Sequence, residues 1–378
     1  MSKVDYLITG GRVIDPYNHV DEVRDVAVKD GIIVEADHVE AAQTIDATGC
    51  IVTPGLIDFH CHLGREITNL GIGAGPEAMC FPTGVTTAVD AGTSGVSNYE
   101  AFRAFTMASH VRVKAFLNVC PAGLSTTAYH ENLNPKYFQK VKLLHCLKKY
   151  RDQLLGLKIR QSTELVDGLG LEPMKAMLDI AKEAWCPVVV HTTNPPAKVE
   201  ELARLLRPGD VYAHVYQGKG ETVVRDGQVV SEMPEHQKRG VIFDAANGVN
   251  HFSFRVAKQC LKEGFLPDVI STDLSVKSAY SPGKVFSLPY VISKYIALGL
   301  TLPEIFERAI LNPARLIGEE RELGSLSVGT CGDVTIHQLV PKHVVFQDTF
   351  GESAEGDTLL KTQLTMREGT VVFRQIDF

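Results

Sequence analysis

No two of the eight cysteines have the C-x-x-C spacing that is typical of metal-binding or redox pairs. A chain of 378 residues can bury a large core, so it needs no disulfide staples to fold. Free cysteines are among the residues most often buried in proteins. The cysteine content therefore indicates buried thiols in a reducing compartment.

The sequence also lacks an excess of basic residues and any long apolar run. Its 38 lysines and arginines stand against 45 aspartates and glutamates, which gives a formal net charge of −7 and no support for nucleic-acid binding. No apolar run reaches the roughly 18 residues that a membrane helix needs. Residues 1–5 contain no apolar signal core. We therefore expect a cytoplasmic protein that binds neither nucleic acid nor membrane.

Eight short β-branched runs alternate with amphipathic segments through the middle of the sequence. They are residues 56–59, 86–89, 113–119, 155–159, 188–190, 211–213, 241–243 and 269–271. This alternation predicts an α/β fold of parallel βα units, and eight units can close a (β/α)8 TIM-like barrel with its active site at the carboxyl ends of the strands. An open doubly wound sheet is the main alternative, but no G-x-G-x-x-G follows the first strand.

The two ends of the chain show a different pattern, in which short strands are separated by turn dipeptides such as Asp30-Gly31. Neither end is long enough to bury a core of its own. We therefore predict one small β-sandwich domain built from residues 1–53 and 324–378. The hydrolase-type barrel, residues 54–323, is then inserted between the two terminal segments.

The first predicted barrel strand ends in the sequence DFHCH, at residues 58–62. Side chains alternate between the two faces of a strand, so His60 and His62 point the same way and Cys61 points the other way. Two imidazoles side by side make half of a metal site. Histidine also packs as an ordinary half-buried residue, so this motif alone is a weak signal.

Other predicted strand ends carry polar residues too. Lys158 closes the fourth strand, His191 the fifth and His214 the sixth, and Asp273 follows the eighth. A barrel gathers these positions around one active site, whereas structural histidines are expected to be scattered along the chain. The pattern therefore predicts a metal site that is built from several strand ends.

Lys158 is the unusual member of this set, because an ammonium group repels a cation and has no lone pair. Two interpretations remain open from its position alone. Carbon dioxide could convert the amine to a carbamate, which is an anionic ligand with two oxygens that can bridge two metals. Alternatively, Lys158 is a buried lysine that pairs with a carboxylate.

Taken together, several motifs make the chain similar to the amidohydrolase superfamily of metal-dependent hydrolases, over nearly its full length. The motifs are the strand pair at 5–15, VTPGLIDFHCH at 52–62, GVTT at 84–87, NPAR at 312–315 and GSLSVG at 324–329. Two further stretches, VDAGTSG at 89–95 and GLKIRQS at 156–162, resemble the dihydroorotase-like amidohydrolase and deacetylase subgroup.

The resemblance implies a binuclear centre with two divalent metal ions, usually zinc. It implies that the first ion is held by His60, His62 and Asp273, the second by His191 and His214, and that both are bridged by carbamylated Lys158. In the expected mechanism, water activated by the metals attacks an acyl carbonyl. Asp273 takes the proton of that water and passes it to the leaving group.

Two positions concern substrate binding. The subgroup usually has Gly-His-Gly after the seventh strand, and Asn247 stands where that histidine is expected. Asn247 can still hydrogen-bond a substrate, while His251 either substitutes for the missing imidazole or, as we prefer, is a packed or solvated side chain. Arg65 could clamp a substrate carboxylate or be a solvated loop residue.

These features favour a metal-dependent hydrolase that removes an acyl group from a small N-acyl or O-acyl compound. A cyclic amidase of the dihydroorotase or hydantoinase type ranks lower, because Gly64 holds the position where dihydroorotases have arginine. A catalytically silent scaffold is a third alternative, although every expected ligand position is filled. A deaminase is disfavoured by Lys158. Similar proteins are commonly homo-oligomers.

Overall fold

The computed structural model describes residues 2–64, 67–68, 73–126, 131–280 and 283–378. Its centre is a curled sheet of seven parallel strands in the order β16-β13-β12-β11-β10-β9-β8. In chain order the strands are β8 (Leu56–Cys61), β9 (Val85–Gly95), β10 (Arg112–Asn118), β11 (Leu154–Arg160), β12 (Val188–His191), β13 (Val211–Ala213) and β16 (Ile242–Asp244). Every predicted barrel strand but the last is therefore present as a regular strand.

The segment 269–274 closes the sheet into a barrel. Its amide and carbonyl groups bond to both edge strands: Ala245 N donates to Val269 O at 2.9 Å, and Asp273 N donates to His60 O at 2.6 Å. It makes single bridges instead of a continuous ladder, and Asp273 has a left-handed φ of 52° that interrupts extended backbone. The predicted (β/α)8 barrel is confirmed, with an irregular eighth strand.

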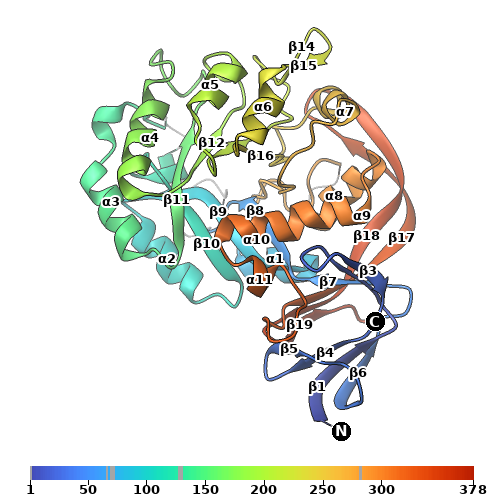
Figure 1. The fold of residues 1–378 in the computed structure, drawn as a ribbon. Helices are drawn as coiled ribbons and strands as arrows, with labels where there is room; N and C mark the ends of the chain where they lie inside the picture. The colour runs from blue at the N-terminus through green and yellow to red at the C-terminus, as the bar shows by residue number, and fades with distance from the viewer. Residues whose placement is uncertain (1, 65–66, 69–72, 127–130, 281–282) are drawn as a thin grey trace.

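Helices cover the outside of the barrel (Figure 1). The longer ones are α2 (Tyr99–Met107), α3 (Lys140–Lys149), α4 (Glu172–Ala184), α5 (Val199–Leu205), α6 (Glu232–Lys238), α7 (Phe254–Lys262) and α8 (Leu288–Ala297). Shorter ones are α1 (Pro76–Cys80), α9 (Leu302–Phe306), α10 (Asn312–Ile317) and α11 (Glu320–Leu323), with single turns at Phe81–Thr83, Gly123–Thr126, Pro135–Tyr137 and Glu307–Leu311. Within the described ranges, no helix has the length and apolar character needed to cross a membrane.

Apolar side chains hold the barrel together in two layers, one in its interior and one between the strands and the surrounding helices. Strands β8 and β9 are buried along their whole length, as expected for strands with side chains on both a filled interior and a helix-covered face. The interior is filled by Phe59, Val89, Phe116, Val189, Val211, Ala213, Ala246 and Val269. These side chains plug the barrel, so polar residues at the strand ends face a pocket and not a pore.

The terminal segments form two further sheets, in the orders β5-β4-β1-β6 and β19-β18-β17-β7-β2-β3. Their strands are β1 (Ser2–Thr9), β2 (Arg12–Asp15), β3 (Val20–Val23), β4 (Val26–Lys29), β5 (Ile32–Val34), β6 (Val39–Asp46), β7 (Ile51–Pro54), β17 (Val334–Gln347), β18 (Ser353–Arg367) and β19 (Thr370–Arg374). The antiparallel pair β7–β17 joins the two ends of the chain, and apolar side chains of both sheets share one cluster.

One hairpin reaches beyond these sheets. Strands β17 and β18 are much longer than predicted, and they rise along the side of the barrel (Figure 1). Leu360 N of β18 donates to Ser293 Oγ of α8 at 2.9 Å. A smaller hairpin, β14 (Val224–Arg225) and β15 (Gln228–Val229), turns at Asp226-Gly227, a dipeptide that favours tight hairpin turns.

Candidate metal centre

The end of β8 delivers the two predicted histidines to the pocket. His60 is buried, and its Nδ1 lies 3.0 Å from Asp244 Oδ2 of β16. His62 Nδ1 lies 2.9 Å from Thr93 Oγ1 of β9. Both rings are therefore held through Nδ1, which leaves each Nε2 directed toward the pocket. A metal-ligating histidine is held in the same way, through its other ring nitrogen.

Asp273 joins these two histidines from the segment that closes the barrel. Its Oδ1 lies 3.2 Å from His62 Nε2 and 3.8 Å from His60 Nε2. One ligand atom from each of these three residues lies within 4.8 Å of the others. The structure thus brings together the three residues that were predicted to hold the first cation.

Lys158 is fully enclosed at the end of β11, and its Nζ lies 3.1 Å from His60 Nε2. Room for its stem comes from Gly92, since a Cβ at that position would stand 2.6 Å from Lys158 Cγ. Burial lowers the pKa of the Lys158 amine to about 8, partly opposed by Asp273 and Asp244. A substantial fraction of this amine is therefore neutral near pH 8.

His191 and His214 meet on the other side of the pocket, with ring centroids 4.4 Å apart. His214 Nδ1 donates to the carbonyl of Ala246 at 2.7 Å, so its Nε2 carries the lone pair. Among the described residues, that buried Nε2 has no hydrogen-bond partner. A buried ring nitrogen without a partner needs an explanation, and a cation at this point supplies one.

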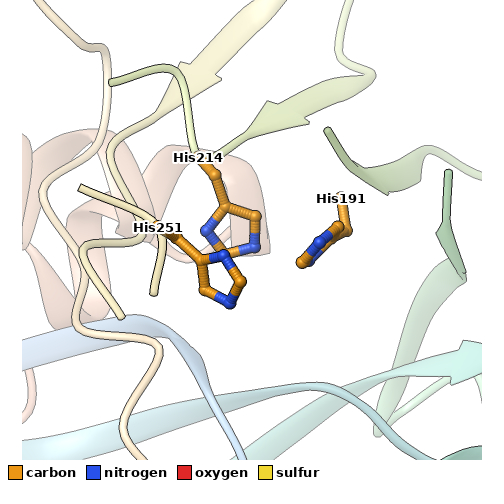
Figure 2. A group of neighbouring side chains, drawn as sticks. All are labelled: His191, His214 and His251. Atoms are coloured by element: carbon orange, nitrogen blue, oxygen red, sulfur yellow. The ribbon is translucent and has the colours of Figure 1, made fainter. Parts of the chain in front are cut away.

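His251 lies in the site, although it was not among the predicted metal ligands. We expected a packed or solvated side chain, but its ring lies 4.3 Å from that of His214 and 4.8 Å from that of His191, between centroids (Figure 2). One ligand atom from each of these three histidines lies within 4.8 Å of the others. The sequence does carry one indication of this role, because His251 lies in the loop that follows β16, at the carboxyl end of a barrel strand.

The two predicted substrate contacts have different outcomes. Asn247 is fully buried outside the pocket lining, and its amide is used internally. Its Nδ2 donates to Ser271 O at 3.1 Å and its Oδ1 accepts from Lys294 Nζ at 3.3 Å. In the structure Asn247 anchors the loop after β16, and a contact with substrate stays a prediction. Arg65 lies outside the described residues.

A pocket of about 350 Å³ opens over both groups of ligands, which is a size that suits a small molecule. Besides the residues above, its lining includes Arg160 and Lys277. Arg160 bonds to the buried carboxylate of Glu131 at 3.0 Å. Two cationic side chains thus lie beside the candidate metal centre.

The electrostatics of the site favour neutral imidazoles. Burial, together with nearby cationic groups, holds the pKa values of His60, His191 and His214 well below the ordinary value, and burial lowers that of His251 to about 4. Neutral imidazole is the form that binds a metal. Nitrogen donors together with one carboxylate fit divalent ions such as Zn²⁺.

Comparison with known proteins agrees with this chemistry. The model of the amidohydrolase family matches residues 51–372. A deacetylase from Agrobacterium fabrum is 33% identical over 313 residues, which cover 82% of this chain and 76% of the relative. A crystal structure of an adenine deaminase aligns with a TM-score of 0.90 at 25% identity, covering 98% of this chain and 100% of that one. A dihydroorotase structure aligns at 0.88 and 29% identity, covering 98% and 99%. The resemblance inferred from the sequence is confirmed, and the chain belongs to the amidohydrolase family.

Proposed function

We propose that this amidohydrolase is a metal-dependent deacylase that hydrolyses an amide or ester bond of a small N-acyl or O-acyl compound. The observation that carries the proposal is the convergence of imidazoles, a carboxylate and a buried lysine on one pocket at the carboxyl ends of the barrel strands. The deacetylase name of a relative that is 33% identical supports the same class of reaction.

The donor set fits two divalent cations, and zinc suits its many imidazoles. His60, His62 and Asp273 hold the first cation, and His191 and His214 contribute to the second. When bound, such ions lower the pKa of a water molecule and polarise an acyl carbonyl. The chain's own part is to orient these donors through the outer hydrogen bonds of their rings.

Carbamylation of Lys158 adds a second anionic ligand to a donor set whose only other carboxylate is that of Asp273. The neutral amine attacks carbon dioxide, one N–C bond forms and one proton leaves, so the side chain ends in two oxygens with a single negative charge. Among the described residues, Lys158 Nζ hydrogen-bonds to His60 and not to a carboxylate. This contact pattern supports the carbamate over the alternative of a lysine paired with an acid.

Asp273 moves the proton. Its carboxylate lines the pocket and retains some exposure, with 11% of the side chain accessible. It accepts the proton of the attacking water and delivers it to the leaving nitrogen or oxygen, as a general base and then a general acid. One residue can do both because the proton that Asp273 gains in the first step is the proton that it donates in the second.

Arg160 and Lys277 suggest which acyl compounds enter. Both line the pocket next to the ligands, and cationic side chains bind carboxylates well. Arg160 is paired with the buried carboxylate of Glu131, but 29% of its side chain remains accessible. The preferred substrates are therefore acylated amino or hydroxy acids with a free carboxylate.

A cyclic amidase is the second candidate, because a structure called a dihydroorotase matches over almost the whole chain. The two functions differ in the bond that is broken, which is exocyclic in one and within a ring in the other. Both need the same donor set, so the metal centre alone does not separate them.

A substrate panel tests the proposal. Enzyme reconstituted with Zn²⁺ is assayed against N-acetyl amino acids, O-acetyl hydroxy acids and cyclic imides, each free acid beside its methyl ester. We expect hydrolysis of N-acetyl or O-acetyl acids, a lower KM for free acids than for esters, and loss of turnover after chelation. Turnover of cyclic imides alone overturns deacylation in favour of the cyclic amidase. No turnover on any compound, with metal bound, overturns both.

We also propose a cytoplasmic location. All eight cysteines are free thiols in the structure, and none forms a disulfide. Unpaired thiols persist in a reducing compartment. Fractionation of the source cells tests this location, and we expect the protein in the cytosolic fraction.

A further inference from the structure

The geometry points to His251 as a third imidazole ligand of the second cation, beside His191 and His214. This inference rests on the binuclear centre of the proposed function and goes beyond it, since the family resemblance implies only two histidines at this position. The second cation would then have three protein nitrogens and the Lys158 carbamate as ligands.

The first argument is the spacing of the three rings. One ligand atom of each lies within 4.8 Å of the others (Figure 2). Zinc holds imidazole nitrogen at about 2.0–2.1 Å, so two nitrogens on the same ion are separated by at most about 4.2 Å. The three ligand atoms are therefore close to the separation that one ion requires, and a small contraction of the site would bring them onto it.

The second argument is how the ring of His251 is held. His251 Nδ1 lies 2.8 Å from Thr193 Oγ1, which directs Nε2 into the pocket. His60, His62 and His214 are held in the same way, each through Nδ1 and each with Nε2 directed inward. Metal-ligating histidines almost always have such an outer partner. A solvated histidine has no need of one.

The third argument is the backbone that carries the ring. Gly248 has a left-handed φ of 55°, and a Cβ there would stand 2.5 Å from Asp273 Oδ2 and 2.6 Å from His251 Cδ2. Only glycine allows the loop to bring His251 this close to Asp273. Asn247 fixes the start of the same loop through Ser271 O. The loop thus places the ring of His251 beside Asp273, where it can approach the rings of His191 and His214.

Metal titration of His251→Asn and Thr193→Val tests the inference. Apoprotein is titrated with Zn²⁺ by calorimetry and with Co²⁺ by visible absorption, which reports the ligands of the ion directly. His110→Asn is the control, because His110 is exposed and precedes β10 at the opposite end of that strand from the pocket. Circular dichroism of each apoprotein shows that it has folded.

We expect wild type and His110→Asn to bind two ions. His251→Asn should bind the first ion unchanged and the second at least about 10-fold more weakly, with an altered Co²⁺ spectrum, and Thr193→Val should show a smaller loss in the same direction. Second-ion affinity within twofold of wild type, with the Co²⁺ spectrum unchanged, overturns the inference. Two bound ions with no hydrolysis of any substrate overturns the proposed function instead, so the two failures are distinguishable.

Discussion

Asp273 stands between the two groups of imidazoles, and its two oxygens face different partners. Oδ1 lies 3.2 Å from His62 Nε2, and Oδ2 lies 3.6 Å from His251 Nε2. The backbone at Asp273 takes a left-handed φ of 52°, a conformation that costs a non-glycine residue energy and that is common at functional sites. The closing segment of the barrel therefore holds this carboxylate between the two groups of candidate metal ligands.

Replacing Asp273 by asparagine separates proton transfer from metal binding. The amide has nearly the same shape but cannot accept a proton, so kcat is expected to fall by at least about 100-fold while most of the metal stays bound. The two measurements are kcat and metal content of the same preparation. Asp226→Asn is the control, since Asp226 lies exposed in the β14–β15 turn. Full turnover with full metal content in Asp273→Asn would contradict the proton-transfer role.

The Lys158 carbamate is testable without an activity assay. Enzyme prepared in ¹³C-bicarbonate should show one labelled carbamate carbon per chain by NMR, and Lys158→Ala should lose it. Lys294→Met is the matched control, because Lys294 is equally buried but its Nζ is occupied by the carbonyl of Lys284 at 2.8 Å. A labelled carbon that persists in Lys158→Ala, or is absent from active wild type, removes the bridging ligand.

The predicted metal ligands could be found because they lie at the carboxyl ends of barrel strands, whereas His251 could not be found in this way. Residues such as His191 and His214 end regular strands, and a barrel places all such ends at one face. His251 lies in a loop, where no periodicity tells which way a side chain points. Asn247 shows the converse, because its position near a strand end suggested a substrate contact, while its side chain turns into the protein.

At the scale of elements, prediction was best where burial is uniform. The strands of the barrel read as short β-branched runs because both of their faces are covered. Strand β6 was not predicted, since most of its residues are exposed, half of them are polar, and it is an edge strand that pairs with β1. The far halves of β17 and β18 were missed for a similar reason. They pair with each other around Pro341, away from the sandwich core.

Strand β17 contains a buried histidine whose protonation opposes folding. His337 is fully enclosed and stacks on Phe306, and among the described residues its Nε2 has no hydrogen-bond partner. Burial lowers the pKa of His337 to about 3, whereas an unfolded chain gives imidazole a pKa near 6.5. Between these values the unfolded state binds more protons, so the stabilising effect of a neutral His337 is complete above about pH 6.5 and is lost as the pH falls.

The difference in unfolding free energy between wild type and His337→Leu isolates this effect. As the pH falls from 6 to about 4, wild type should lose roughly 1.4 kcal/mol of unfolding free energy per pH unit relative to His337→Leu. Urea unfolding followed by circular dichroism measures it. His343→Asn, on the exposed end of the same strand, should keep the wild-type profile. A pH-independent difference for His337→Leu would show that the imidazole is not buried in its neutral form.

At the scale of the whole molecule, one carboxylate ties the barrel to the terminal sheets. Asp333, just before β17, is buried and bonds to Arg112 of β10 at 2.8 Å. Its Oδ1 also accepts from the backbone N of Glu368 at 2.8 Å, and its carbonyl accepts from Gly55 N, between β7 and β8. These bonds connect segments that are far apart in the sequence. We therefore expect the two parts of the molecule to unfold together.

The charge of Asp333 is stabilised in the folded state. Burial alone would raise its pKa, but Arg112 and Arg367 outweigh that effect and hold the pKa below its ordinary value. The contribution of a carboxylate with a depressed pKa is complete above its unfolded value, near 3.9, and is lost only as the pH falls through the lower folded value. The junction is therefore fully formed at pH 5 and above.

Asp333→Asn should consequently destabilise the whole chain by about 3–5 kcal/mol, because Arg112 loses its buried carboxylate partner and keeps only the exposed carboxylate of Glu368. The deficit should be equal at pH 5 and pH 8, since both lie above the titration range of Asp333. Urea unfolding should still show a single transition at a lower midpoint.

Glu368→Gln is the control: its exposed carboxylate pairs with Arg112 at 3.2 Å, and such surface pairs contribute less than about 1 kcal/mol. A second transition that appears in Asp333→Asn alone would mean that the sheets and the barrel unfold separately once this junction is broken. An unchanged midpoint would mean that the junction carries no stability at all.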